Sequence, residues 1–275
     1  MSKTGKTKKQ RAFLKWAGGK YNLVEAINQH LPATSCLVEP FVGAASVFLN
    51  TDYERYVLND INADLIDMYR IIQDDAGDFI KFAREWFNPE WNDKARYIEI
   101  RQRFNLCTDP FERAQLFLYI NRHCFNGLCR YNQSGQFNVP FGKYKKPYFP
   151  EAELWAFAEK AQRATFTCQS YQQVFAQLPA ASAVYCDPPY VPLSKTASFT
   201  SYAKNSFGLD DQADLASLAE AAQQQGHAVL ISNHDTSWTR KIYQGAELHT
   251  IQVGRSISQK GSTRGKVAEL FALYR

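Results

Sequence analysis

The sequence predicts an α/β protein in which a mainly helical segment interrupts a parallel sheet. Short apolar runs typical of strands occur before residue 63 and return after residue 163, whereas the residues between them follow a helical period. With 275 residues and 45% hydrophobic content, the chain can bury one large core, or a core domain with a smaller companion. We therefore expect one sheet domain built from both ends of the chain and a second domain inserted into it.

The first elements of the sheet lie at residues 35–60. Residues 35–49 read as a short buried strand, a turn and the start of a helix. Residues 56–60, Tyr-Val-Leu-Asn-Asp, form a second short strand that ends in an acid. Two such units in succession are typical of the opening of a parallel sheet.

The interrupting segment begins at about residue 63. Apolar side chains recur three and four positions apart in residues 63–122, for example in Leu65, Ile66, Tyr69 and Ile72, and no strong strand breaks this pattern. Residues 123–150 are rich in Gly, Asn, Pro and aromatic residues, which predicts a loop or hairpin region. The second domain is therefore expected at residues 63–145.

The sheet is expected to resume after this insertion. Strand patterns return at residues 164–168, 183–186 and 228–232. An Ala-rich helix is expected at about residues 210–225, between the last two strands.

Composition excludes several classes of protein. No apolar run approaches the roughly 18 residues that span a bilayer, and the Lys-rich start lacks the apolar core of a secretory signal. The 6 cysteines include no Cys-x-x-Cys pair, so we interpret them as reduced thiols. His123, Cys124 and Cys129 lie close in sequence but lack a fourth zinc ligand with ordinary spacing, and we expect no metal. These features predict a cytoplasmic protein.

The net charge of +5 is modest, but the basic residues are concentrated. Residues 1–24 carry basic side chains and no acid, and the first ten predict a flexible basic arm. Another acid-free basic stretch, near the end of the chain, includes Arg255, Lys260, Arg264 and Lys266. Between these two lies a stretch at residues 113–150, in which basic residues alternate with aromatic residues. Its cations are Arg113, Arg122, Arg130, Lys143, Lys145 and Lys146. Phosphate contacts and base stacking use this mixture, which predicts a nucleic-acid surface.

The sequence Asp187-Pro188-Pro189-Tyr190 directly follows an apolar strand. Open α/β sheets bind their ligands outside the carboxyl ends of the strands, so the position suits catalysis. A plain turn has no need for this acid and this aromatic residue, whereas methylation of an aromatic amine uses both. Asp187 and the Pro188 carbonyl can accept the two amine hydrogens, and Tyr190 can stack on the base.

Two further motifs are suited to a nucleotide-like cofactor. Residues 40–45, Pro-Phe-Val-Gly-Ala-Ala, follow the first strand and open a helix, where small residues let the backbone approach a ligand. Asp60 ends the second strand and can bond a ribose hydroxyl. An NAD site is the alternative, but the full Gly-x-Gly-x-x-Gly pattern is missing. Residues 15–20, Lys-Trp-Ala-Gly-Gly-Lys, are not a P-loop because Tyr21 follows Lys20.

Together, residues 15–20, 39–43 and 187–190 resemble the motifs of the DNA adenine methyltransferase (Dam) family, in the motif order of its alpha group. The resemblance extends from about residue 11 to the end, and includes residues 126–132, 137–142 and 231–235. It implies a catalytic domain at residues 11–62 and 146–275, with a Rossmann-like sheet that binds S-adenosylmethionine. It also implies a target-recognition domain at residues 63–145 and methylation of adenine N6 in the duplex sequence GATC.

The resemblance also implies roles for individual residues. Asp187, Pro188 and Tyr190 would be catalytic. The cofactor would be contacted by Trp16, Ala17, Lys20, Phe41, Gly43, Asp60, Ser170, Tyr171 and Asp187. DNA would be contacted by Lys15, Arg101, Arg122, Phe125, Asn126, Leu128, Arg130, Asn132, Asn138, Pro140, Lys143 and Tyr144, with Phe125 inserting between bases. Ala45 and Phe125 stand where the family often has glycine and tyrosine.

Three other functions are alternatives to adenine methylation of DNA. An RNA methyltransferase commonly has Asn, and a cytosine-N4 methyltransferase Ser, at the position of Asp187. A nucleic-acid-binding regulator without activity would have no use for the intact acid, prolines and aromatic residue.

His234 and Asp235 either shape the loop beneath Tyr190 or act on a proton, and Cys186 is interpreted as a small buried side chain. We expect a monomer that binds double-stranded DNA, no membrane and no metal.

Overall fold

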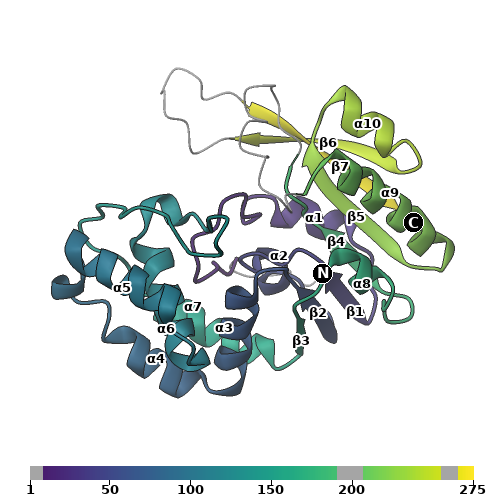
Figure 1. Cartoon of the computed structure of the whole chain (residues 1–275). Coiled ribbons are helices and arrows are strands. Elements are labelled where there is room, and N and C mark those ends of the chain that lie inside the picture. The colour runs from purple at the N-terminus through teal and green to yellow at the C-terminus, as the bar shows by residue number, and fades with distance from the viewer. Residues whose placement is uncertain (1–8, 191–206, 255–265) are drawn as a thin grey trace, which may run out of the picture. The chain divides into compact units, whose positions relative to one another are not determined.

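The computed structural model describes residues 9–190, 207–254 and 266–275 (Figure 1). The predicted arm at residues 1–10 and the basic residues Arg255, Lys260 and Arg264 fall wholly or largely outside this range. The chain forms two compact units, each described by itself below. The helical unit contains residues 43–52 and 62–163 and the chain up to residue 21, and the sheet unit contains residues 22–42, 53–61 and 164–275.

Seven strands form one sheet among the described residues of the sheet unit, in the order β3-β2-β1-β4-β5-β7-β6. The first five pair in parallel, whereas β7 pairs antiparallel with both β5 and β6. The strands are β1 (Cys36–Glu39), β2 (Arg55–Asn59), β3 (Ala164–Thr167), β4 (Ala183–Cys186), β5 (Ala228–His234), β6 (Glu247–Gly254) and β7 (Lys266–Tyr274).

The order of the strands creates a switch point between β1 and β4. From β1 the chain proceeds outward to β2 and β3, and it returns on the other side of β1 to form β4 and β5. Val38 of β1 pairs with Val57 of β2 and with Val184 of β4, so the carboxyl ends of these strands lie at the same edge. In open sheets this edge, at the switch point, is where ligands bind.

Helices of the sheet unit cover its apolar strands. They are α1 (Val24–His30), α8 (Tyr171–Phe175), α9 (Leu209–Gln224) and α10 (Ser237–Ile242). Figure 1 shows α9 lying along β5 and β7, where Leu215 and Ala219 join the core formed by Val229 and Ile231. Burying a side chain such as Leu215 contributes about 2 kcal/mol, which holds α9 on the sheet.

The helical unit is built around α6, whose side chains from Ala114 to His123 are all buried. Asn62, Asp75, Asp93 and Asp109 each cap the start of a helix by accepting a hydrogen bond from a backbone N–H group. The elements are α2 (Ser46–Leu49), α3 (Ala63–Asp74), α4 (Ala76–Arg84), the 3-10 turn η1 (Pro89–Trp91), α5 (Lys94–Leu106), α6 (Pro110–His123), the 3-10 turn η2 (Phe125–Gly127) and α7 (Glu151–Ala161).

The fold class predicted from the sequence is confirmed. Each predicted strand is present within one or two residues of its expected bounds, and the Ala-rich helix is α9. The antiparallel strands β6 and β7 were not predicted. In the part of the chain that the structure describes, no helix is long and apolar enough to cross a membrane.

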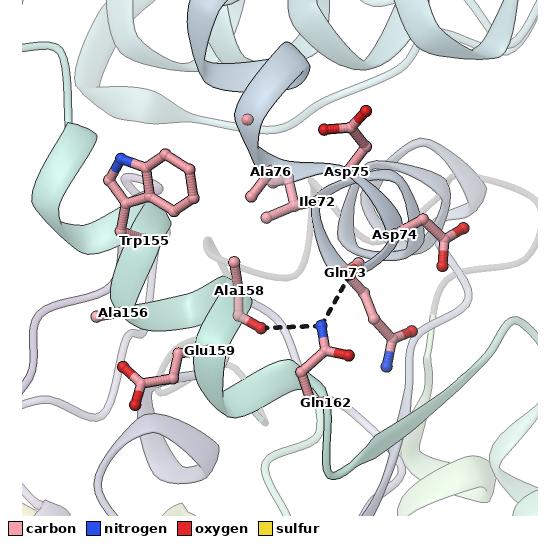
Figure 2. Close-up of a pocket in the computed structure, with 11 residues that line it drawn as sticks. Ile72, Gln73, Asp74, Asp75, Ala76, Trp155, Ala156, Ala158, Glu159 and Gln162 are labelled. Carbon is pink, nitrogen blue, oxygen red and sulfur yellow. Dashed lines mark hydrogen bonds between the residues drawn. The ribbon is translucent and has the colours of Figure 1, made fainter.

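A surface hollow of about 620 Å³ lies in the helical unit, where α3, α4 and α7 meet (Figure 2). The Trp155 indole and the carboxylates of Asp74 and Asp75 line it, and Gln162 donates to the Ala158 and Gln73 carbonyls beside it. No residue predicted to bind DNA, bind cofactor or act in catalysis is among the residues that line it.

Candidate active site and DNA interface

Asp187 follows β4 directly, at the carboxyl edge of the sheet. The Ser232 hydroxyl on β5 donates a hydrogen bond of 3.3 Å to the Asp187 Oδ1 atom. The Tyr185 hydroxyl lies 3.0 Å from the Ser232 oxygen and can donate to it in turn. The Ser232 hydroxyl also has the Cys186 carbonyl as an acceptor at 3.4 Å, so its one hydrogen is shared between two acceptors. Since Tyr185 and Ser232 are buried, this chain of hydroxyls helps to orient the Asp187 carboxylate.

Tyr190 is held at both ends of its side chain. Its hydroxyl donates to Glu269 on β7 at 2.9 Å, and its ring packs edge-on against His234, with ring centroids 4.8 Å apart. Burial, followed by the charge of Asp187, raises the pKa of Tyr190 well above its usual value, so the phenol stays protonated and remains a donor.

His234 and Asp235 shape the loop beside Tyr190. Asp235 forms an ion pair of 2.6 Å with Arg240 and accepts from Thr250, and the hydrogen bond from Arg240 lowers the pKa of Asp235. Arg240 lies in the last turn of α10, so the pair connects the end of β5 to that helix. Among the uses left open by the sequence, these contacts favour a structural role.

Four residues predicted to bind the cofactor lie at the ends of β1, β2 and β3. Phe41 follows β1, and its ring contacts Tyr171 with centroids 5.7 Å apart. Asp60 follows β2, and its backbone N–H donates to the Thr167 carbonyl of β3. Ser170 caps α8 through its side-chain oxygen, which accepts from Gln173. The structure therefore brings the acid and the aromatic residues to the same edge of the sheet as Asp187.

The remaining predicted cofactor residues belong to the helical unit. Gly43 has a positive φ of 45°, and a Cβ atom there would lie 2.9 Å from the Trp16 indole nitrogen. The Tyr69 hydroxyl donates to the Gly43 carbonyl at 2.6 Å. A side chain at position 43 would displace Trp16, which explains why this turn uses glycine.

Three neighbours complete this part of the helical unit. Lys20 is buried and donates to the Gly18 carbonyl at 2.8 Å, whereas Ala17 is exposed. Ala45 adopts the left-handed region with φ 59° at the start of α2. That conformation costs a non-glycine residue roughly 1–2 kcal/mol.

A ribbon at residues 124–141 confirms the expected loop or hairpin region and carries seven of the twelve residues predicted to contact DNA. Isolated bridges pair Cys124 with Phe141 and Tyr131 with Phe137. The Phe125 N–H donates to the Pro140 carbonyl at 2.8 Å, and the Phe125 side chain is 44% exposed. Asn126 also has a positive φ, so the chain turns sharply directly after Phe125.

Asn121 fixes Lys15 against this ribbon. The buried Asn121 amide accepts from the Lys15 N–H at 2.9 Å and donates to the Lys15 carbonyl at 2.8 Å. The Lys15 ammonium donates to the Arg122 carbonyl and lies over the Tyr144 ring. These contacts bring three predicted DNA-contact residues together, Lys15, Arg122 and Tyr144.

Arg130 is exposed at the other end of the ribbon. Its Nε and Nη2 groups donate to the side-chain and backbone oxygens of Asn138, at 2.7 and 3.4 Å. Asn132 turns its side-chain oxygen toward the N–H groups of Ser134 and Gln136. Arg101 donates to the Val139 carbonyl at 3.0 Å. Leu128 is partly exposed, and Pro140 and Lys143 are exposed.

Arg122 differs from these residues because it is only 8% exposed. Its guanidinium donates to the Tyr148 carbonyl at 3.0 Å and to the Phe13 carbonyl at 3.3 Å. A contact between Arg122 and DNA stays a prediction.

The comparisons with known proteins agree with this geometry. The family of D12 class N6 adenine-specific DNA methyltransferases matches residues 16–257. The chain belongs to this family. It is 60% identical over 268 residues to a DNA adenine methylase of Vibrio cholerae, covering 97% of both chains. A DNA adenine methylase of Escherichia coli is also 60% identical, with 98% of this chain and 96% of that protein covered. For the Serratia marcescens protein of the same name the identity is 57%, with coverage of 98% and 100%.

The protein is therefore a DNA adenine methyltransferase, and Asp187-Pro188-Pro189-Tyr190 is one of the three motifs on which its sequence resemblance to the family rests. The sequence did not single out Asn121, Ser232 or Gln212, each a buried polar residue next to a predicted site residue. A polar residue inside an apolar helical or strand pattern, such as Asn121 after Ile120, is the signal that could have indicated them.

The three residues that were considered as zinc ligands from the sequence are His123, Cys124 and Cys129, and they make contacts within the protein. His123 is buried, bonds the Tyr119 carbonyl at 2.8 Å, and has its pKa lowered by burial to about 4. The Cys129 sulfur accepts from Asn62 at 3.3 Å. Over residues 9–190, 207–254 and 266–275, no group of three or more His, Cys, Asp or Glu side chains could hold a metal ion.

Proposed function

We propose that this methyltransferase uses S-adenosylmethionine to methylate adenine N6 in duplex DNA, in the sequence GATC, with the target base flipped out of the helix. The observation that carries the proposal is the position of Asp187, directly after β4 and beside the switch point between β1 and β4.

Asp187 and the Pro188 carbonyl are proposed to accept hydrogen bonds from the two N6 hydrogens. The N6 lone pair is delocalised into the ring, and acceptors on both hydrogens favour the tetrahedral nitrogen that can attack a methyl group. The bond from Ser232 to Asp187 supports this role, because it orients the carboxylate before the base arrives. The Tyr190 ring, fixed by Glu269 and His234, is proposed to stack on the flipped base.

The residues of each unit fit the proposed cofactor. From the sheet unit we propose Phe41, Asp60, Ser170, Tyr171 and Asp187. From the helical unit we propose Trp16, Ala17, Lys20 and Gly43. The glycine backbone packed on the Trp16 indole, and the acid directly after β2, suit an aromatic base and a ribose. S-adenosylmethionine would supply an already activated methyl group on a sulfonium.

Residues 63–145 are proposed as the target-recognition domain, and residues 11–62 and 146–275 as the catalytic domain. The exposed Phe125 ring at a sharp turn is suited to insert between base pairs. Lys15, Leu128, Arg130, Pro140 and Tyr144 are proposed to read the site. Arg101, Asn126, Asn132, Asn138, Lys143 and Arg122 are proposed to contact the DNA around them.

The test combines donor-labelled methyl transfer to a GATC duplex with base-resolved mapping of the product. Wild-type protein should label only the adenine of GATC. Asp187→Ala should bind the duplex normally but lose methyl transfer, because removing one oriented acceptor costs about 3 kcal/mol or more in the barrier. Labelling at other sequences would contradict the GATC assignment. Normal turnover by Asp187→Ala would contradict the mechanism.

A further inference from the structure

A buried polar network in the sheet unit joins the backbone of the Ser232-Asn233-His234 segment to the backbone of the catalytic turn. The Gln212 Nε2 group, in the first turns of α9, donates to the Pro189 carbonyl at 2.6 Å. The Gln212 Oε1 atom accepts from Asn233 Nδ2 at 2.8 Å and from the Tyr243 hydroxyl at 3.1 Å. Gln212, Asn233 and Tyr243 are all buried, so water does not compete for these bonds.

Backbone groups at both ends determine which way each amide points. The His234 N–H can only donate, and it donates to Asn233 Oδ1 at 2.9 Å. Asn233 must therefore turn its NH₂ group toward Gln212, and the same group donates to the Tyr243 hydroxyl at 3.1 Å. With its oxygen occupied by two donors, Gln212 must turn its own NH₂ group toward Pro189, whose carbonyl can only accept.

We propose that Gln212 is a positioning residue for methyl transfer. By holding the Pro189 carbonyl it fixes the peptide planes of the catalytic turn, and with them the directions of the Pro188 carbonyl and the Asp187 carboxylate. Prolines have no N–H group with which to anchor such a turn, so the carbonyl is the backbone group that Pro189 offers. The inference rests on the proposed function, since it presumes that these two oxygens accept from the target amine.

In the described part of the chain, the Gln212 side chain forms hydrogen bonds only within this network, and its backbone N–H donates to the Gly208 carbonyl. A residue that only filled space between α9 and β5 could be Leu or Met, as are many helix residues on such a face. Gln212→Met keeps the volume and removes the donor. Gln212→Glu keeps the shape and makes the donor depend on protonation.

The experiment measures the single-turnover rate of methyl transfer on a GATC duplex, with the full chain, saturating S-adenosylmethionine and a temperature below each variant's melting midpoint. Gln212→Met should lose on the order of 10- to 100-fold in rate, because small displacements of reacting groups cost that much. Its dissociation constants for DNA and for S-adenosylmethionine should match those of the wild type. Gln212→Glu should be slow near neutral pH and regain rate relative to wild type as pH falls, because a protonated carboxyl donates to Pro189 again.

Tyr53→Phe is the matched control, since the Tyr53 hydroxyl donates to the Pro32 carbonyl at 2.8 Å, before β2 and at the opposite edge of the sheet. It should lower the melting midpoint without changing the methyl-transfer rate. A Gln212→Met protein with the wild-type rate would overturn the inference. Should that variant not fold, a Gln212→Glu rate that stays low at every pH would overturn it as well. If wild-type protein itself does not methylate GATC, the proposed function fails instead.

Discussion

The Lys15 ammonium lies 3.4 Å from the centroid of the Tyr144 ring and 3.1 Å from the Arg122 carbonyl oxygen. The Lys15 stem packs against the backbone of Gly127. This arrangement holds a cation between an aromatic face and a carbonyl before any DNA is bound. It also removes water from the ammonium, and burial, with the nearby charge of Arg122, lowers the pKa of Lys15 from 10.5 to about 8.

Lys15 is proposed to read the outer guanine of GATC, and its discrimination at that base pair should therefore weaken as pH rises through about 8. A neutral amine is a poorer donor to guanine acceptors than an ammonium, so the loss should be confined to the base pair that Lys15 reads. The measurement is the ratio of kcat/KM on GATC to kcat/KM on a duplex changed at the outer guanine, below and above that pH. In Lys15→Met the ratio should be low and independent of pH. A wild-type ratio that stays flat would remove Lys15 from the reading set.

The lowered pKa of Lys15 should also make the stability of the folded protein rise with pH, whereas base discrimination falls. The unfolded chain, with its lysine pKa near 10.5, binds the proton more tightly than the folded chain does. The stability cost of burying charged Lys15 is fully present below pH 8 and is relieved as pH rises from about 8 toward 10.5. Relative to Lys15→Met, wild-type protein should gain stability over that window, which denaturant unfolding at several pH values would measure.

Gly127→Ala should disturb Lys15 as well as the fold. Gly127 has φ +63°, and a Cβ atom there would lie 2.1 Å from the Lys15 Cβ atom. Gly135→Ala is the control, because Gly135 has φ +73° but nothing within 4 Å of its Cβ position. Each substitution carries a left-handed backbone cost of roughly 1–2 kcal/mol. Only Gly127→Ala should destabilise further and lower discrimination at the base pair that Lys15 reads. Equal melting midpoints for the two variants would contradict the packing argument.

Substitutions at Arg122 and Lys143 should affect different properties, the first the stability of the fold and the second the binding of DNA phosphates. Arg122→Ala leaves two backbone carbonyls without their donor, so the free energy of unfolding should fall by about 1–3 kcal/mol or more. Lys143 is exposed, so Lys143→Gln should leave stability nearly unchanged. If Lys143 contacts a phosphate, its loss should make the slope of log affinity against log salt shallower by about 0.9. Denaturant unfolding and duplex binding at several salt concentrations measure both quantities. An unchanged slope in Lys143→Gln would exclude that phosphate contact.

The sequence indicated the parts of the fold and site whose signals are local. Asp187 follows a continuous apolar run, so both strand and strand-end acid are visible in a few residues. β7 was missed because Ala268-Glu269-Leu270-Phe271-Ala272 is as compatible with a helix as with a strand. β6 is an edge strand, and its side chains from Glu247 to Gln252 are at most partly buried, so no clear apolar alternation marks it.

The polar residues that position the site were not predictable for a different reason. Gln212 stands between Asp211 and Ala213 near the start of a helix, where a polar residue is ordinarily solvated. Its burial depends on Asn233 and Tyr243, which are distant in sequence, so only the tertiary structure identifies it.

The last prediction concerns Arg130, whose guanidinium is braced by Asn138. Asn138 occupies the Nε hydrogen and one Nη2 hydrogen of Arg130. The edge formed by Nη1 and the other Nη2 hydrogen keeps donors for the two major-groove acceptors of a guanine. Arg130→Ala should therefore lose about 1–3 kcal/mol of discrimination at that base pair, roughly 5- to 150-fold.

Asn138→Ala should lose a smaller part of the discrimination at the same base pair, because the guanidinium is present but no longer oriented. The double variant should be no worse than Arg130→Ala, since Asn138 acts through Arg130. The measurement is kcat/KM on GATC and on duplexes changed at each single position, at one salt concentration. If Arg130→Ala lost activity equally on every duplex, with a salt slope shallower by nearly one unit, Arg130 would be a phosphate contact. Additive losses of discrimination in the double variant would instead show that Asn138 reads that base pair independently of Arg130.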